Sequence, residues 1–378
     1  MEQKNILTRP RNGRKLSGVC AAIASARQGK HTLLVDKQIL LGGLATVGRI
    51  NWLEPYCDGK GHQVIGGLAK ELFDRAIACG YSNIPKGWTQ GKGRLASWFS
   101  PEAFMLELSA WLFEEHVDLL LDTQVVGIHL ENNNIHHVVV ANLNGCEEIS
   151  ADGFVDATGT AQLFYLSGLP CVYGENYLTL VSDIVDEESL HLALEKNTPY
   201  LVRNRTNYGA TLYGQGQPAG VPPSAVHNAW EQTQWILDAQ SLMRKESADI
   251  DPKQREVISL PAMAQIRMLR RMVGDTTFIG VPGTKADDSI GVIPDFRKKY
   301  DLFELPFGSL HTSDCKNLYA AGRCISATGE GWHISRVIGP CCLTGEAAGL
   351  AAALKGDIHA VQDALVQSGI RIKLDDLI

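Results

Sequence analysis

The sequence predicts an α/β fold in which a Rossmann-like three-layer domain with a β-meander is joined to a discontinuous second domain of mixed α+β structure. Three observations support this prediction: a small-residue helix and apolar strand near the amino terminus, alternating strands after residue 118, and a second strand, glycine turn and small-residue helix near the carboxyl terminus. At 378 residues the chain exceeds the usual size of one hydrophobic core, so we expect two joined domains.

The amino-terminal segment is typical of half a βαβ unit. Residues 17–28 carry small apolar side chains at helical spacing, Gly29 ends the helix, and residues 31–36 form a short apolar strand. The strand before the helix is short, because only residues 5–8 precede a segment that contains Pro10.

The segment after residue 100 changes from a helical to an extended period. Residues 101–115 are expected to form a helix. Residues 119–130, 135–143 and 147–156 alternate or run apolar, with Asn-rich and Asn-Gly turns between them. We therefore expect a three-stranded meander.

The remaining elements are predicted from the positions of Gly and Pro residues and from small-residue patterns. Residues 213–223 are rich in Gly and Pro and form a loop, while residues 224–245 and 261–273 are expected to be helices. Residues 315–322 form a buried strand that runs into a glycine turn, and residues 339–354 form a helix rich in Ala and Gly.

Charge and cysteine content exclude several classes of partner. The 35 Lys and Arg against 42 Asp and Glu give a formal net charge of −7, which does not favour nucleic acid. Nine widely spread cysteines do not form a secreted disulfide framework, and no apolar run reaches the roughly 20 residues of a membrane span. We expect a cytoplasmic protein with no membrane span, and neither the cysteines nor His136 and His137 predict a metal site.

The turn before residue 18 has part of a dinucleotide-binding pattern. Gly13 and Gly18 stand where the outer glycines of G-x-G-x-x-G belong, but Lys15 replaces the middle one. Asp36 lies eighteen residues beyond Gly18, where an acid binds the adenosine ribose. A phosphate loop of the P-loop type is disfavoured, because Val19 and not lysine follows Gly18.

Several segments resemble a known family. Residues 18–27, 34–37 and 41–46 resemble the amino-terminal half of the FAD-dependent oxidoreductase family, which is related to glutathione-reductase-type flavoproteins. Residues 156–159 resemble its second FAD-contacting turn, and residues 317–353 its carboxy-terminal flavin segment. The resemblance implies FAD as the cofactor and transfer of a hydride or electrons between a small organic substrate and FAD.

The resemblance also implies which residues contact FAD. The list is Gly13 and Gly18 beside the pyrophosphate, Asp36 at the adenosine ribose, Gly42 and Gly43 close to the cofactor, Val126 in the strand facing adenine, Thr158 and Gly159 in the second turn, Gly322 and Arg323 at the pyrophosphate or ribityl chain, and Cys341 at the start of a helix whose positive end faces the flavin pyrimidine.

The sequence departs from the family at the pyrophosphate turn, where residues 8–15 carry four cations and a proline. These cations either pair with the pyrophosphate or form a solvated basic loop. Gly329 also stands where family members often carry histidine. Two alternatives therefore stay open: a non-catalytic descendant with impaired FAD binding, and a nicotinamide-dependent dehydrogenase that needs no flavin.

Arginines and one histidine are the candidates for substrate chemistry. On the predicted helix, Arg267, Arg270 and Arg271 share one face and could bind an anionic substrate; otherwise they form a solvated or interdomain face. His333 as an acid and Arg336 as an anion anchor lie beside the flavin segment, although a structural histidine is the commoner case. We take Arg271, His333 and Arg336 as the catalytic candidates.

The resemblance and the patterns together predict the domain bounds. The FAD-binding domain would comprise residues 1–51, 101–172 and 310–355, the substrate or cap domain residues 52–100 and 173–309, and the carboxyl-terminal tail residues 356–378.

Overall fold

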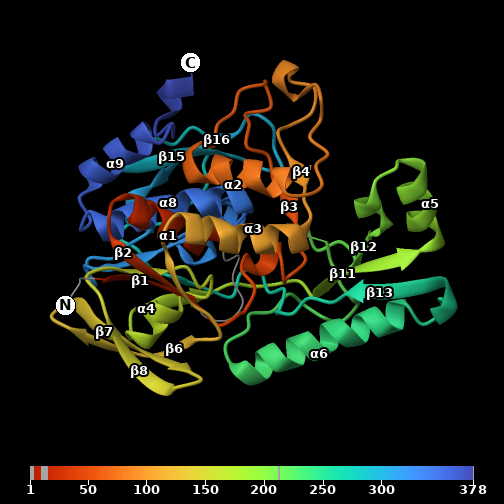
Figure 1. Ribbon diagram of the computed structural model, residues 1–378, viewed down its shortest axis with the longest axis horizontal. Coiled ribbons are helices and arrows are strands. Elements are labelled where there is room, and N and C mark those ends of the chain that lie inside the picture. Colours follow the sequence, from red (N-terminus) through yellow and green to blue (C-terminus); the bar gives the residue numbers. More distant parts are fainter. Residues whose placement is uncertain (1–3, 10–15, 212, 378) are drawn as a thin grey trace.

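The computed structural model describes residues 4–9, 16–211 and 213–377 (Figure 1). The helices are α1 (Leu16–Arg27), α2 (Gly67–Ala78), α3 (Pro101–Glu114), α4 (Gln162–Leu166), α5 (Glu187–Glu195), α6 (Ala229–Glu246), α7 (Gly329–Ser335), α8 (Ile338–Ala353) and α9 (Ile358–Gln367). The strands are β1 (Lys4–Arg9), β2 (His31–Asp36), β3 (Trp52–Leu53), β4 (Ser97–Trp98), β5 (Asp118–Leu120), β6 (Gln124–Glu131), β7 (Asn134–Asn142), β8 (Gly145–Ser150), β9 (Phe154–Asp156), β10 (Cys171–Tyr173), β11 (Thr179–Asp186), β12 (Asn204–Gly209), β13 (Arg255–Ser259), β14 (Arg270–Met272), β15 (Ser289–Pro294), β16 (Leu302–Pro306) and β17 (Leu318–Ala320).

A parallel sheet with the strand order β17-β9-β1-β2-β5 forms the middle layer of the main body. Helices α1 and α8 cover one face, and the β6-β7-β8 meander packs on the other (Figure 1). The predicted Rossmann-like three-layer α/β fold is confirmed. Strands from both ends of the chain join in this sheet, because β1 and β17 both pair with β9.

Helices α1 and α8 touch backbone to backbone. A Cβ at Gly345 would lie 2.1 Å from the carbonyl oxygen of Ser17, and one at Gly349 would lie 2.2 Å from that of Ala21. Only glycine allows this approach, which explains the small-residue composition of both helices. The contact joins residues more than 300 positions apart in the sequence.

The meander is confirmed, but the outer ends of its predicted strands were assigned wrongly. Residues 118–120 and 154–156 leave the meander and form β5 and β9 of the parallel sheet. The chain turns between β5 and β6, where Asp122 has a φ of 47°. Hydrophobic alternation does not distinguish antiparallel from parallel partners, so the sequence pattern merged these strands.

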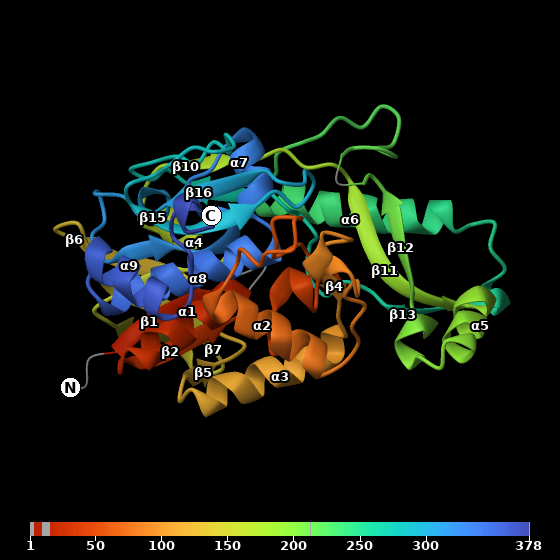
Figure 2. The ribbon, with the colours of Figure 1, turned by 90° about the horizontal axis from the view of Figure 1, so that it is seen from above.

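A second lobe extends from the main body (Figure 2). Helix α6 packs on the β12-β11-β13 sheet around a separate apolar cluster that contains Leu180, Tyr208 and Trp235. The predicted helix over 224–245 is confirmed, but α6 begins later because the Asn228 side chain accepts the amides of Trp230 and Glu231.

The main core also takes in segments that we assign to other domains. Helix α2 lies in the predicted cap but packs on α8, and α9 of the predicted tail packs on α8 and β15. The residue bounds of the domains stay a prediction.

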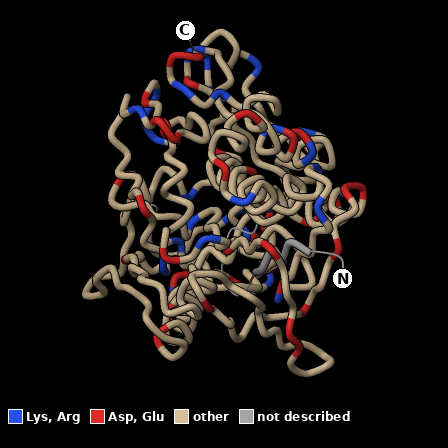
Figure 3. The backbone as a smooth tube through the Cα atoms, turned by 90° about the vertical axis from the view of Figure 1, so that its left-hand side faces the viewer, with Lys and Arg blue, Asp and Glu red and all other residues tan. Residues whose placement is uncertain are grey.

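Charged residues of both signs are interspersed along the chain in the view of Figure 3. This distribution agrees with the moderate formal charge of −7. None of the helices in the described part of the chain combines the length and apolar character that crossing a membrane requires.

The close contact of α1 with α8 gives a stability prediction. Gly345→Ala should lower the free energy of unfolding by about 2 kcal/mol, because its new Cβ overlaps the Ser17 carbonyl. In a solvent-exposed helix a Gly→Ala substitution raises the free energy of unfolding by about 1 kcal/mol. A decrease at Gly345 would therefore indicate the close contact with α1. Urea denaturation measures the change, and a gain in stability would contradict the contact.

Glu346 on α8 gives a pH-dependent prediction. Its buried carboxyl accepts the amide of Leu68 at 2.7 Å and the hydroxyl of Ser368 at 2.9 Å, and burial raises its pKa to about 7. Between the ordinary pKa of 4.5 and about 7 the folded protein binds more protons than the unfolded chain. The free energy of unfolding should therefore fall, by up to about 3 kcal/mol, as pH rises through this window.

Glu346→Gln should remove that part of the pH dependence, since its amide oxygen can accept the Leu68 amide, its NH2 group can donate to the Ser368 hydroxyl oxygen, and neither group titrates. Asp74→Asn, at an exposed carboxylate on α2, is the matched control and should leave the slope unchanged. Urea denaturation of each variant at about pH 5 and about pH 8 measures the difference. An equal slope in wild type and Glu346→Gln would show that Glu346 does not titrate in this window.

Candidate cofactor and substrate site

The carboxyl edge of the parallel sheet gathers the predicted cofactor residues. Strands β2, β9 and β17 run in the same direction and end at Asp36, Asp156 and Ala320. The carboxyl ends of parallel strands form the usual ligand edge of such sheets. The predicted residues that follow each strand therefore converge, whereas Gly13 and Lys15 lie outside the described residues.

Asp36 is fully buried where β2 ends. Its Oδ1 accepts the amide of Gln38 at 3.0 Å, and its carbonyl accepts the amide of Thr123 at 3.0 Å. Gly18 is buried in the first turn of α1. The contacts of Gly18 with the pyrophosphate and of Asp36 with the ribose stay a prediction.

The turn after residue 40 needs its glycines for its own geometry. Gly42 and Gly43 have φ values of 98° and 60°, and a Cβ on Gly42 would lie 2.4 Å from the Thr46 side chain. The Thr46 hydroxyl in turn donates to the carbonyl of Leu41 at 2.5 Å. Glycine is required at residue 42 whether or not a cofactor passes close to it.

The second predicted turn is built around a buried carboxylate. Asp156 accepts the amides of Thr158 at 3.0 Å and Leu163 at 2.7 Å. Burial raises the pKa of Asp156, and these hydrogen bonds oppose the shift. Gly159 follows with a φ of 66°, so the turn is fixed by backbone conformation and by Asp156 together.

Gly322 and Arg323 begin the carboxyl-terminal half of the site. Gly322 has a φ of 77°, and its amide donates to the Thr344 hydroxyl at 2.9 Å. Arg323 is buried and donates to the carbonyls of Ile266 and Arg267 at 2.5 and 2.7 Å. In this structure Arg323 therefore braces the backbone segment that carries Arg267. Its contact with the pyrophosphate or ribityl chain stays a prediction.

Two further predicted residues lie within β6 and α8. Val126 occupies a bulge in β6, where the register passes from Val125 to Gly127 and leaves Val126 without a partner residue in β7. Cys341 lies buried in the first turn of α8, with its thiol 3.6 Å from the carbonyl of Ser335. Burial raises the pKa of the adjacent Cys342 thiol well above its ordinary value, which favours a packing role.

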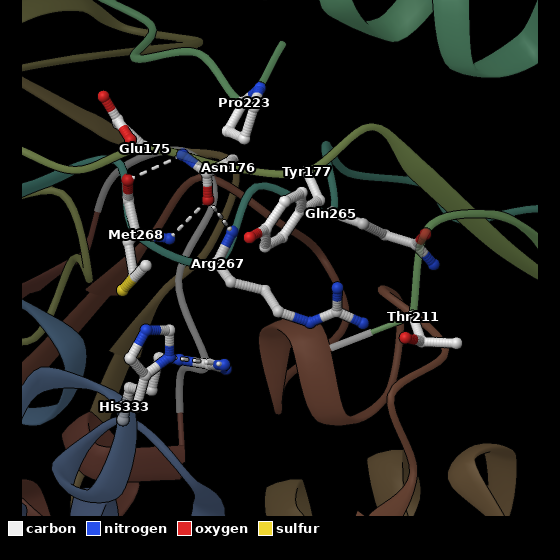
Figure 4. Close-up of a pocket in the computed structure, with 10 residues that line it drawn as sticks. Glu175, Asn176, Tyr177, Thr211, Pro223, Gln265, Arg267, Met268 and His333 are labelled. Atoms are coloured by element: carbon white, nitrogen blue, oxygen red, sulfur yellow. Dashed lines mark hydrogen bonds between the residues drawn. The ribbon is translucent and has the colours of Figure 1, made fainter. Parts of the chain in front are cut away.

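A cavity of about 170 Å³ lies between the main body and the second lobe (Figure 4). Arg267, His333 and Arg336 line it together with Asn176 and Met268. The Asn176 side-chain oxygen accepts the amides of Arg267 at 3.0 Å and Met268 at 2.8 Å, which fixes the backbone that presents Arg267. Residues distant in the sequence thus meet around one small cavity.

His333 and Arg336 form a pair in this cavity. An Nη of Arg336 lies 3.4 Å from Nδ1 of His333. Partial burial, followed by the charges of Arg336 and Arg297, lowers the pKa of His333 to about 4. The imidazole is therefore neutral near pH 7, which does not suit the predicted role as a proton-donating imidazolium.

The prediction of a helix over 261–273 is wrong. This segment is a loop that ends in β14, where Arg270 and Arg271 point to opposite sides. Arg270 donates to the carbonyl of Thr160 at 2.8 Å, and Arg271 to that of Met272 at 3.0 Å. The three arginines consequently do not share a face, and of them it is Arg267 that lines the cavity.

The sequence reasoning missed Glu54. Its carboxylate accepts the amide of Ile338 at 3.1 Å, at the amino terminus of α8. The two residues are 284 positions apart, and no local pattern indicates this contact.

The comparison with family models decides the family. The model of the FAD dependent oxidoreductase family matches residues 13–261 and 224–367. The chain belongs to this family. The resemblance found in the sequence is thereby confirmed, and with it FAD as the cofactor.

Comparison with solved structures finds distant similarities. CabE, an aromatic hydroxylase from angucycline biosynthesis, aligns at 10% identity and a TM-score of 0.49 over 98% of this chain and 66% of its own, so this chain spans just under two thirds of its length. A geranylgeranyl bacteriochlorophyll reductase-like protein from Thermoplasma acidophilum aligns at 12% identity and a TM-score of 0.48, over 97% of this chain and 82% of its own. L-proline dehydrogenase from P. horikoshii aligns at 11% identity and a TM-score of 0.44, over 98% of this chain and 94% of its own. Comparison with the curated proteins finds no match.

The described residues of this family member fit FAD at the carboxyl edge. The Ser335 hydroxyl is buried next to the start of α8 and has no hydrogen-bond partner among the described residues, so it is available to a ligand. The amino terminus of the 16-residue helix α8 favours the negative charge that a flavin gains on reduction.

Asp36 allows a direct test of the ribose assignment. Asp36→Ala should weaken FAD binding by about tenfold to a hundredfold, because a hydrogen bond to a charged group is lost. Asp118→Ala, at an exposed carboxylate on the neighbouring strand β5, should bind FAD like the wild type. Titration calorimetry with FAD measures both dissociation constants. Equal constants for the two variants would show that Asp36 does not hold the ribose.

Proposed function

We propose that this FAD-dependent oxidoreductase transfers a hydride or electrons between a small organic anion and bound FAD. The observation that carries the proposal is the convergence of Arg267, His333 and Arg336 on one cavity immediately before α8. Arg336 and Arg267 hold the carboxylate of the substrate, a ligand that guanidinium groups bind well. We assign this role to Arg267 in place of the predicted Arg271, because the Arg271 guanidinium donates hydrogen bonds to the Met272 carbonyl and the Ser326 hydroxyl.

The neutral His333 supplies a positioning contact. Because Arg336 faces Nδ1, the other ring nitrogen carries the hydrogen and donates it to an oxygen of the substrate. When bound, FAD supplies the two-electron acceptor for a hydride, and the accompanying proton of the substrate passes to solvent. Since its pKa is about 4, His333 should cause no change in rate between about pH 6 and about pH 8.

The proposal predicts a defined loss on removing Arg336. The FAD-reconstituted protein is mixed without oxygen with a panel of small hydroxy, amino and aromatic carboxylic acids. At least one acid should bleach the visible absorption of the flavin, and Arg336→Met should slow that bleaching by about tenfold or more. Lys298→Met, which removes an exposed cation elsewhere, should leave the rate unchanged.

Two results would contradict the proposal. Bleaching at equal rates in wild type and Arg336→Met would show that Arg336 in this cavity does not bind the substrate anion. Protein that binds no FAD would support the non-catalytic alternative, and NADH binding by the same flavin-free protein would support the nicotinamide alternative.

A further inference from the structure

A second cavity, of about 270 Å³, adjoins the first. Arg267 and Arg336 line both cavities, so these two guanidinium groups lie at the boundary between them. The second cavity differs in character, because Trp52, Trp98 and Phe296 line it. An anion held at this boundary can therefore extend its body among aromatic side chains.

The two tryptophans form a fixed pair. Trp52 and Trp98 are register partners in the short strands β3 and β4, and their ring centroids lie 4.9 Å apart at 52°. Both side chains are only partly buried, although they lie between the two lobes. Large aromatic surfaces left open to a cavity are a common feature of ligand sites.

Arg205 completes the aromatic wall. Its guanidinium lies 4.8 Å from the ring centroid of Trp98 and donates to the Asn51 side chain at 2.8 Å. Trp98 is thus held between Trp52 and Arg205. A preorganised ring loses little freedom when a ligand packs against it, which favours flat and rigid ligands.

We propose that this second cavity, here named the tryptophan cavity, selects an aromatic monocarboxylate as the substrate. The carboxylate lies at Arg267 and Arg336, and the ring packs against Trp52 and Trp98. The Glu54 carboxylate on the same wall offsets the charge of Arg205, so Arg267 and Arg336 remain to bind one carboxylate. The inference rests on the proposed function for the anion end of the substrate, and adds the aromatic body.

The volume agrees with a small ring. Ligand pockets measure roughly 300–1,000 Å³, so about 270 Å³ accommodates one aromatic ring with its carboxylate and little more. Benzoate and cyclohexanecarboxylate are suitable probes, since they have the same charge and nearly the same size but differ in aromatic character.

The test measures the dissociation constants of both probes by titration calorimetry on the FAD-reconstituted protein. Benzoate should bind about fivefold more tightly than cyclohexanecarboxylate. Trp98→Leu should abolish that preference and still bind both acids, while Trp98→Phe, which keeps an aromatic face, should retain it. Trp230→Leu, at an exposed tryptophan on α6, is the matched control and should behave like the wild type.

The outcomes separate the two proposals. Equal binding of the two acids by the wild type, with weaker binding by Arg336→Met, would overturn the aromatic preference and leave the anion site intact. Binding of neither acid would overturn the aromatic substrate, whereas bleaching of the flavin by another carboxylic acid of the panel would still support the proposed function. A preference that persists in Trp98→Leu would overturn the role of the tryptophan cavity.

Discussion

The contact between α1 and α8 is the constraint on which the rest of the structure depends. Two helices from opposite ends of the chain meet with no side chain between their backbones at Gly345 and Gly349. This spacing lets both helices lie on the same parallel sheet beside β1 and β17. Segments from both ends of the chain therefore meet at one sheet.

The same contact positions the chemistry. Arg336 lies two residues before the start of helix α8, and Arg323 lies in the turn that follows β17. The residues that line or brace the cavities are therefore close to elements packed on the sheet. Arg323 reaches across to the Ile266 carbonyl and ties the segment of Arg267 to the main body. The second lobe supplies side chains to a site whose frame belongs to the sheet.

The sequence predicted what depends on local pattern. Small-residue helices, the strand before Asp36 and the glycine turn at Gly322 follow from spacing and backbone freedom, and the structure has them. The segment 261–273 was mispredicted, because apolar spacing alone did not reveal that long-range contacts hold it as a loop and strand. The contact of Glu54 with α8 depends on the folded topology and has no local signal. The presence of Arg267 and Arg336 at the same two cavities also depends on the folded topology.

The central claim is that both ends of the chain enclose one FAD molecule. Hydrogen exchange of the backbone amides, measured with and without saturating FAD, tests it most directly. The account predicts that FAD slows exchange together in residues 16–45 and residues 318–345. Protection confined to one of these segments, or no change in either, would contradict a site shared by the two ends.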